Sequence, residues 1–182
     1  MTTYKIDPAH SEITFKVKHL MITNVTGKFT KFDATMQADR DDFTDAVVIF
    51  EADVNSITTH TEQRDAHLKS DDFFNAEKYP KITFKSTALK KESDEDYKLF
   101  GDLTIRDITK PIELKVTYNG LITDPWGNER AGFEIEGKIN RLEYGLKWNV
   151  LTDTGGMVAG KDVKLLINVE MVKQTVEAAQ QA

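Results

Sequence analysis

Residues 13–19, ITFKVKH, alternate between apolar and polar side chains, and a histidine ends the apolar series. A period of two residues is typical of a β-strand, and it places Phe15 and Val17 on one face together with His19. Strands with one polar face favour antiparallel pairing, because parallel sheets are covered on both faces and their strands are apolar throughout. This stretch therefore predicts a strand of an antiparallel sheet.

The same alternation recurs in seven further segments, which brings the predicted strands to eight. Eight long antiparallel strands form either a sandwich or a closed barrel, and we favour the barrel because closure removes the two exposed edges of the sheet. In residues 24–38 the phase slips between Phe29 and Phe32, which predicts a β-bulge near Thr30 or Lys31. The fold is thus predicted to be all-β, an eight-stranded antiparallel β-barrel. Its other strands are expected at 48–54, 82–88, 97–105, 112–118, 131–139 and 163–171.

The connections between the predicted strands differ in length. Residues 58–80 and 142–162 are long, and both follow odd-numbered strands, so an up-and-down barrel brings them to the same mouth. Short polar turns close the other end, at residues 39–42, 92–96 and 124–127, and the last of these has the composition of a type I turn.

The first long connection has two segments of helix-compatible composition, Thr61–Leu68 and Ser70–Asn75. Ser70 is placed to cap the second segment, because a serine hydroxyl accepts hydrogen bonds from the free amides at a helix start. The sequence therefore predicts a short helical insertion after strand three, with Phe73 and Phe74 in a lid over the mouth.

The predicted inward face carries many small residues, interleaved with aromatic ones. Because protein interiors are close-packed, unfilled volume on this scale is costly unless a ligand occupies it. An elongated apolar ligand fits such a space; the alternative is that large side chains opposite the small ones fill it. The small inward residues are Gly27, Ala34, Ala52, Ser86, Ala88, Gly101, Ala131 and Gly137.

The predicted binding residues follow from the same register. His19 and Arg141 end the inward faces of strands one and seven, which makes them candidates for contact with a ligand head group, and Trp148 is expected to cap the mouth. For His19, Arg64 and Arg141, a structural hydrogen bond between lid and rim is an equal alternative. The predicted lining residues are Phe15, Val17, Phe29, Phe50, Phe84, Leu103, Phe133 and Ile135.

The composition indicates one globular domain, expected over residues 1–174 with a tail at 175–182. Of the 182 residues, 40% are hydrophobic and 30% charged, and no apolar run approaches the roughly 20 residues of a membrane-spanning helix. The start of the chain lacks a secretory signal, so we expect a cytoplasmic protein. The absence of cysteine excludes disulfides and cysteine-ligated clusters, and the net charge of −6 makes nucleic acid a poor partner.

Neither a catalytic site nor a metal site is predicted. Asp7, His10 and Ser11 resemble fragments of a catalytic triad, but they are too close along one segment, and His10 and Ser11 are expected to fix the entry to strand one. His60 and His67 match no strong zinc signature. Two alternatives to a protein that only binds an elongated apolar ligand stay open: an enzyme that acts on a lipid-like substrate through His19 or His67, and a stress or interaction protein whose dry barrel is only a scaffold.

Several separated motifs of this chain, from about Tyr4 to Val172, resemble those of the YceI-like family. Two departures are Asp107, where many relatives have glycine, and the missing secretory signal. The motifs are Asp7-x-x-His10-Ser11, Val25-x-Gly27-x-Phe29, Arg64-x-x-His67-Leu68-x-Ser70-x-Asp72-Phe73-Phe74, Tyr79-Pro80-x-Ile82-x-Phe84, Gly101-x-Leu103-Thr104-Ile105, Thr109-Lys110-Pro111, Asn140-Arg141 and Tyr144-Gly145-Leu146.

The resemblance implies a lipocalin-like barrel with an elongated apolar pocket that binds polyisoprenoid lipids. It further implies a role in the transport, storage or sequestration of a polyisoprenoid or an isoprenoid quinone, a homodimer, and no established catalysis. No cofactor is expected besides the bound lipid.

Overall fold

The computed structural model describes residues 1–153 and 155–175. Within these ranges one antiparallel sheet contains 11 strands in the order β1-β4-β5-β7-β8-β9-β10-β11-β2-β3-β6, and β1 also pairs with β11. The strands are β1 (Thr2–Ile6), β2 (Glu12–His19), β3 (Thr23–Phe29), β4 (Phe32–Ala38), β5 (Val47–Asp53), β6 (Ile57–Thr58), β7 (Lys81–Lys91), β8 (Asp96–Ile105), β9 (Ile108–Thr123), β10 (Glu129–Asn140) and β11 (Ala159–Lys173).

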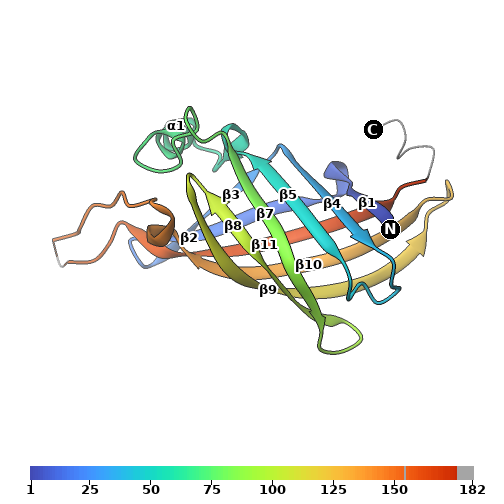
Figure 1. Ribbon diagram of the computed structural model, residues 1–182. Coiled ribbons are helices and arrows are strands. Elements are labelled where there is room, and N and C mark those ends of the chain that lie inside the picture. The colour runs from blue at the N-terminus through green and yellow to red at the C-terminus, as the bar shows by residue number, and fades with distance from the viewer. Residues whose placement is uncertain (154, 176–182) are drawn as a thin grey trace.

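The sheet closes into the predicted eight-stranded barrel, because the six short strands β1 to β6 form three pairs, and each pair takes the place of one long, interrupted strand (Figure 1). β11 pairs with β2 along its first part and with β1 along its last part. β1 and β2 therefore occupy one place in the ring. β3 and β4 occupy the next place, because β3 pairs with β2 and β4 pairs with β1. β6 pairs with β3 and β5 pairs with β4, so β5 and β6 occupy the third place. Each neighbour in the ring is antiparallel, as the one-sided alternation predicts.

The interruptions explain where the strand predictions were right and wrong. β3 ends at Phe29 and β4 begins at Phe32, which confirms the predicted break at Thr30 and Lys31. The expectation of long strands is correct for β7 to β11. It is wrong for the first three predicted strands, at 13–19, 24–38 and 48–54, which correspond to short strands. A 3-10 turn, η1 (Pro8–His10), separates β1 from β2, and another, η2 (Val54–Ser56), separates β5 from β6. β1 was not predicted, because alternation over Thr2–Ile6 is too short to be distinctive.

A bulge in β7 corrects one predicted inward residue. The register of β7 against β8 shifts between Ser86 and Ala88, so that Leu89 replaces Ala88 on the buried series. One extra residue in a strand moves every later side chain to the opposite face. Leu89 consequently faces the interior, where the uninterrupted alternation had placed a smaller residue.

The end of the barrel at which β1 begins and β11 ends, referred to below by these termini of the described chain, is closed by turns, as predicted, although one turn is longer than expected. β4 ends at Ala38 and β5 begins at Val47, so this loop spans residues 39–46 rather than 39–42. At residues 124–127 the predicted turn forms, with the Gly127 amide donating to the Asp124 carbonyl at 3.0 Å. The interior at this end is therefore reached by loop residues as well as by strands.

The opposite end carries the two long connections (Figure 1). Helix α1 (Glu62–Lys69) confirms the first predicted helical segment, displaced by one residue. The predicted second helix, capped by Ser70, is wrong: residues 71–74 form turns. Ser70 instead ends α1, because its Oγ donates to the carbonyl of His67 at 2.6 Å. The second connection begins with a 3-10 turn, η3 (Arg141–Tyr144).

Of the predicted tail, residues 176–182 lie outside the described residues. In the part of the chain that is described, no helix is long and apolar enough to cross a membrane.

Candidate functional site

A cavity of about 430 Å³ occupies the interior of the barrel. Every strand from β7 to β11 contributes to its wall, as do β2 to β5, so the cavity follows from the closed sheet rather than from any single loop. All eleven residues predicted as binding residues line it: Phe15, Val17, His19, Phe29, Phe50, Phe84, Leu103, Phe133, Ile135, Arg141 and Trp148. Their contact with a ligand stays a prediction.

The predicted small residues are only partly responsible for this space. A Cβ added to Gly27 would lie 2.3 Å from the Phe15 ring, and one added to Gly101 would lie 2.3 Å from the Phe84 ring. Large neighbours thus fill the volume beside these glycines, which is the alternative in which large side chains opposite the small ones fill the interior. Even so, Phe15 and Val17 stay half-exposed inside the barrel, as do several residues of β11. The interior is therefore packed locally and hollow along its axis.

An aromatic cluster, which we call the aromatic plug, seals the cavity at the end with the termini. Phe43, from the loop between β4 and β5, lies 5.8 Å from Tyr4, 5.5 Å from Tyr118 and 5.8 Å from Phe133, measured between ring centres. All three contacts are edge-to-face, the geometry that aromatic pairs prefer. Burial raises the pKa of Tyr4 and of Tyr118. Phe133 is the plug residue that also lines the cavity and so forms its floor.

Sequence reasoning missed the role of Phe43. It is 3% exposed and has a left-handed backbone, with φ of 59°. The available signal was one aromatic residue among acidic and polar neighbours, directly after the predicted turn at residues 39–42. A solvent-exposed turn has no need of such a side chain, which is why an inserted plug is a better explanation.

At the other end, Arg141 is 3% exposed and donates four hydrogen bonds to backbone carbonyls. Its Nε donates to Gly160 at 2.8 Å, its two terminal nitrogens to Leu146, Trp148 and Ala159 at 2.6, 2.9 and 3.1 Å. These bonds fasten η3 and the following loop to the start of β11, which is the structural role proposed as an alternative. Burial lowers the pKa of the guanidinium.

Arg64 also ties the lid to the rim. Its guanidinium donates to the hydroxyl and the carbonyl of Thr59, at 2.7 and 2.8 Å. The Asp65 carboxylate accepts from the amide and hydroxyl of the same threonine. Two adjacent side chains, Arg64 and Asp65, therefore hold α1 against the end of β6. For Arg64, this geometry supports a structural hydrogen bond between lid and rim.

Trp148 lies at the mouth, where it joins the two long connections. Its ring centre is 4.8 Å from that of His67 and 5.5 Å from that of Phe73. His67 Nε2 is 2.8 Å from the Asp72 carboxylate, and this bond orients the imidazole. We call Trp148, His67 and Phe73 the aromatic gate. It confirms that the two connections meet at one mouth, and that Phe73 belongs to the lid.

Among the residues that the structure describes, polar side chains border the cavity only at this mouth. Lys18, His19 and Arg64 are exposed and line it, which shows that the cavity reaches the surface here. The remaining polar lining residues are Thr59, His67 and Arg141, and the rest of the wall is apolar. Such a site can hold an apolar body along the axis, with its polar end at the mouth.

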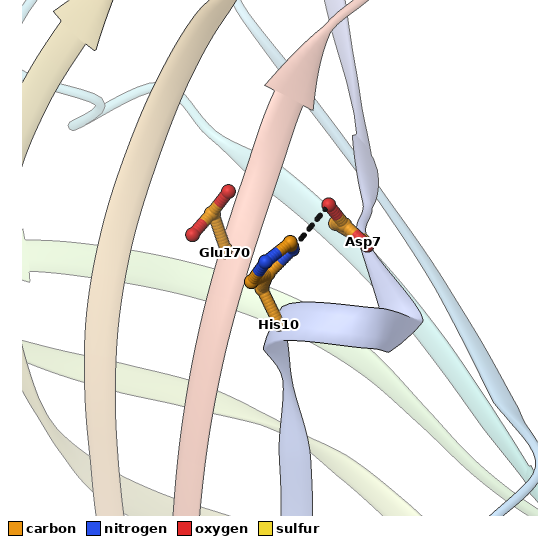
Figure 2. A group of neighbouring side chains, drawn as sticks. All are labelled: Asp7, His10 and Glu170. Carbon is orange, nitrogen blue, oxygen red and sulfur yellow. Dashed lines mark hydrogen bonds and ion pairs between the residues drawn. The ribbon is translucent and has the colours of Figure 1, made fainter. Parts of the chain in front are cut away.

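The residues that resembled a triad lie outside the cavity, between β1 and β2: Asp7 is half-buried, His10 is exposed and Ser11 is buried. His10 Nδ1 is 2.9 Å from Asp7 Oδ2 (Figure 2). The Ser11 hydroxyl instead accepts a hydrogen bond from the Glu170 amide at 3.0 Å. Ser11 therefore fastens the start of β2 to β11, as predicted, and is not turned toward the imidazole.

Among the described residues, one group of potential metal ligands gathers within 4.8 Å: Asp7, His10 and Glu170 (Figure 2). The Arg130 guanidinium lies 2.8 Å from Asp7 and 2.5 Å from Glu170, so a cation of the chain itself already bridges these carboxylates. Arg130 also contacts Asp124 at 2.6 Å. Hydrogen bonds from His10 and Arg130 lower the pKa of Asp7 to about 2.

The chain matches the model of the YceI-like domain over residues 4–171. A UPF0312 protein of Staphylococcus aureus strain USA300 is 39% identical over 171 residues, which cover 93% of this chain and 97% of the relative. Among solved structures, a Campylobacter jejuni YceI protein is 32% identical with a TM-score of 0.73, covering 87% of this chain and 90% of that one.

Two more distant structures share the fold. Burkholderia cenocepacia BcnA has a TM-score of 0.79 at 22% identity, covering 91% of this chain and 98% of its own. A polyisoprenoid-binding domain from Saccharophagus degradans has a TM-score of 0.70 at 13% identity, covering 94% and 98%. With nearly its whole length matched by the family model and by close relatives, the chain belongs to the YceI-like family.

Proposed function

We propose that this protein binds an elongated apolar lipid of the polyisoprenoid or isoprenoid-quinone class inside the barrel, for transport, storage or sequestration. The observation that carries the proposal is the axial cavity of about 430 Å³, apolar along its length and bordered by polar groups only at its open end. Its volume falls within the roughly 300–1,000 Å³ typical of small-molecule sites.

Burial of the chain of the lipid supplies the binding free energy. Each CH₂ group removed from water contributes about 0.8 kcal/mol, so a long hydrocarbon needs no special chemistry to bind. The half-exposed lining residues, such as Phe15 and Val17, would be covered by the same event. Branched isoprenoid chains suit a wall in which aromatic rings alternate with aliphatic side chains.

The head group is proposed to lie at the mouth, near Arg141 and His19. The guanidinium of Arg141 is surrounded by carbonyl dipoles, and among the described residues no carboxylate pairs with it. A buried cation without a counter-charge favours electron-rich groups, such as a quinone oxygen or a phosphate. The name of the S. degradans domain supports the isoprenoid class.

The proposal is tested by uptake of radiolabelled geranylgeraniol into wild type and two variants of β11. Val163 lines the cavity and is half-buried, whereas the adjacent Lys164 is exposed on the outer face. Val163→Trp places a large ring in the cavity, and we expect it to abolish uptake. Lys164→Trp, the matched control, should bind like wild type.

Circular dichroism and thermal melts show whether both variants are folded. Failure of the folded wild type to take up any prenyl lipid would overturn the proposal, and so would equal uptake by both variants. The enzymatic alternative gains no support from the gate, because Asp72 and the two aromatic rings account for the position of His67.

A further inference from the structure

Large apolar side chains are exposed on two neighbouring segments beside the mouth. Met21 and Ile22, in the turn between β2 and β3, are 53% and 77% exposed, and Leu151 in the loop before β11 is 68% exposed. Leu20 and Val150 extend the same surface. The amide of Leu20 donates to the carbonyl of Val158 at 2.9 Å, so the two segments are joined. We call this surface, Leu20–Ile22 with Val150 and Leu151, the apolar rim.

The turn displays these side chains at a cost. Leu20 and Met21 are the central residues of a turn that the Ile22 amide closes by donating to the His19 carbonyl at 3.1 Å. Both have positive φ, of 52° and 62°, a pair of angles that normally requires glycine or asparagine. Residues that are held in such strained backbone conformations cluster at functional sites. The turn would form more easily with small polar residues, which makes the presence of a leucine and a methionine informative.

The apolar rim is continuous with the entrance of the cavity. Lys18 and His19, which precede the turn, line the mouth, and so do Trp148 and Val158 from the second segment. In Figure 1 the connection before β11 extends beyond the barrel on the same side as the β2–β3 turn. A surface that touched the apolar rim would therefore meet the cavity directly.

Charge distinguishes this side of the mouth from the rest of the protein. Residues 16–25 and 142–162 contain four lysines and three acidic residues, Glu143, Asp153 and Asp162, in a chain whose net charge is −6. Lys18, Lys147 and Lys161 are exposed. The lid on the other side of the mouth, residues 58–80, has five acidic and three basic residues. Basic side chains around exposed apolar ones fit the surface of an anionic lipid bilayer.

We infer that the apolar rim docks this protein on an anionic lipid membrane and holds the mouth of the barrel against it. Apolar side chains would enter the interfacial region while the lysines contact lipid phosphates. The inference goes beyond lipid binding in the barrel, because it concerns a different surface and a different partner. It also gives a bound lipid a route that avoids water.

The test is flotation of the full-length protein with vesicles of phosphatidylcholine and phosphatidylglycerol, and with vesicles of phosphatidylcholine alone. We expect binding to the anionic vesicles that weakens with added salt. Leu20→Asn/Met21→Gly removes two apolar side chains and restores the residues that this turn prefers, so it should fold at least as well as wild type. It should nevertheless bind the anionic vesicles about tenfold more weakly.

Lys147→Glu/Lys161→Glu, at two exposed lysines that do not line the cavity, should weaken binding by at least about tenfold through charge alone. The matched control is Ile122→Asn/Trp126→Asn, which removes two exposed apolar side chains at the opposite end of the barrel. We expect this control to bind like wild type. Unchanged binding in both rim variants, or an equal loss in the control, would overturn the inference.

Two further measurements separate this inference from the proposed function and from self-association. Extraction of the same preparations reports bound prenyl lipid: a wild type that carries lipid but ignores anionic vesicles overturns docking alone. Rim variants that keep their lipid and lose vesicle binding support docking. Light scattering reports oligomeric state, and a wild-type dimer that the rim variants convert to monomers would assign the rim to a second copy and overturn docking.

Discussion

At the end with the termini, Phe43 fills the centre of the barrel and Arg130 links three carboxylates on its outer surface; at the mouth, Trp148 joins two loops by ring contacts and leaves the axis open. Both ends are rich in aromatic residues. The difference lies in direction, because the rings of the aromatic plug pack across the axis whereas the aromatic gate stands beside the mouth.

This contrast indicates how one sheet provides both stability and access. The plugged end buries its aromatic rings and concentrates ion pairs near both termini, so its contacts resemble those of an ordinary core. The open end is held by hydrogen bonds from Arg141 and Arg64 to backbone groups, which fix the loops without filling the space between them. Substitutions at the two ends should therefore affect different properties.

The largest effect is expected from Phe43→Ala. Removal of a buried phenylalanine leaves a cavity among Tyr4, Tyr118 and Phe133, and such changes cost about 3–5 kcal/mol in the free energy of unfolding. Urea denaturation followed by circular dichroism measures this loss. A change below about 1 kcal/mol would show that the plug does not carry the stability of the closed end.

Arg141→Met should have the next largest effect. The substitution keeps a long side chain but removes all four hydrogen bonds to backbone carbonyls, of which only the Ala159 carbonyl keeps another side-chain donor, Asn149, and we expect a loss of about 2–3 kcal/mol in the free energy of unfolding. Amide hydrogen exchange should show the loss of protection concentrated around the start of β11. Arg141→Lys is the control that keeps the charge; a wild-type exchange pattern in Arg141→Met would contradict the account.

Arg130→Gln should lower the melting temperature at pH 7, and the difference from wild type should depend on pH. The pKa of Asp7 falls from 3.8 to about 2 through His10 and Arg130, and Arg130 lowers that of Asp124 to about 2. A carboxyl group whose pKa is lower in the folded state than in the unfolded state stabilises the folded state at pH values above the unfolded-state pKa. This stabilisation is lost as the pH falls through the folded-state pKa.

The difference between wild type and Arg130→Gln should accordingly shrink between about pH 4 and pH 2. Thermal melts over this range measure it. A difference that persists unchanged at pH 2 would show that Arg130 acts through packing and not through its ion pairs.

The smallest change in stability is expected from Trp148→Ala, because the ring stands at the open mouth. Its effect should appear in exchange instead: loss of the gate contacts with His67 and Phe73 should speed the release of a bound prenyl lipid several-fold. Stopped-flow transfer of a fluorescent prenyl lipid to vesicles measures this rate. A wild-type release rate would mean that Trp148 has no part in closing the mouth.

The alternation of β8, β10 and β11 made the barrel and most of its lining predictable from sequence, because a period of two assigns each residue to a face. The prediction was wrong at Ala88, where one extra residue shifts the register of β7 and no local signal in the sequence marks it. It was also wrong at Ser70, because a serine between two helix-compatible segments can end the first as readily as begin the second.

Features that depend on contacts distant in sequence were out of reach. Phe43 is held in the aromatic plug by ring contacts with Tyr4, Tyr118 and Phe133, which come from three other parts of the chain. Arg141 was identified at the mouth from register, but its hydrogen bonds to the loop before β11 required the fold. The family motifs gave the lipid class, which periodicity alone does not provide.

The most direct test of the central claim is organic extraction of protein purified under native conditions, followed by mass spectrometry. If the barrel holds a lipid, wild type should yield a long isoprenoid species in an amount comparable to the protein, and folded Val163→Trp should yield little or none. Repeated wild-type preparations without any such species, or equal recovery from Val163→Trp, would contradict the account.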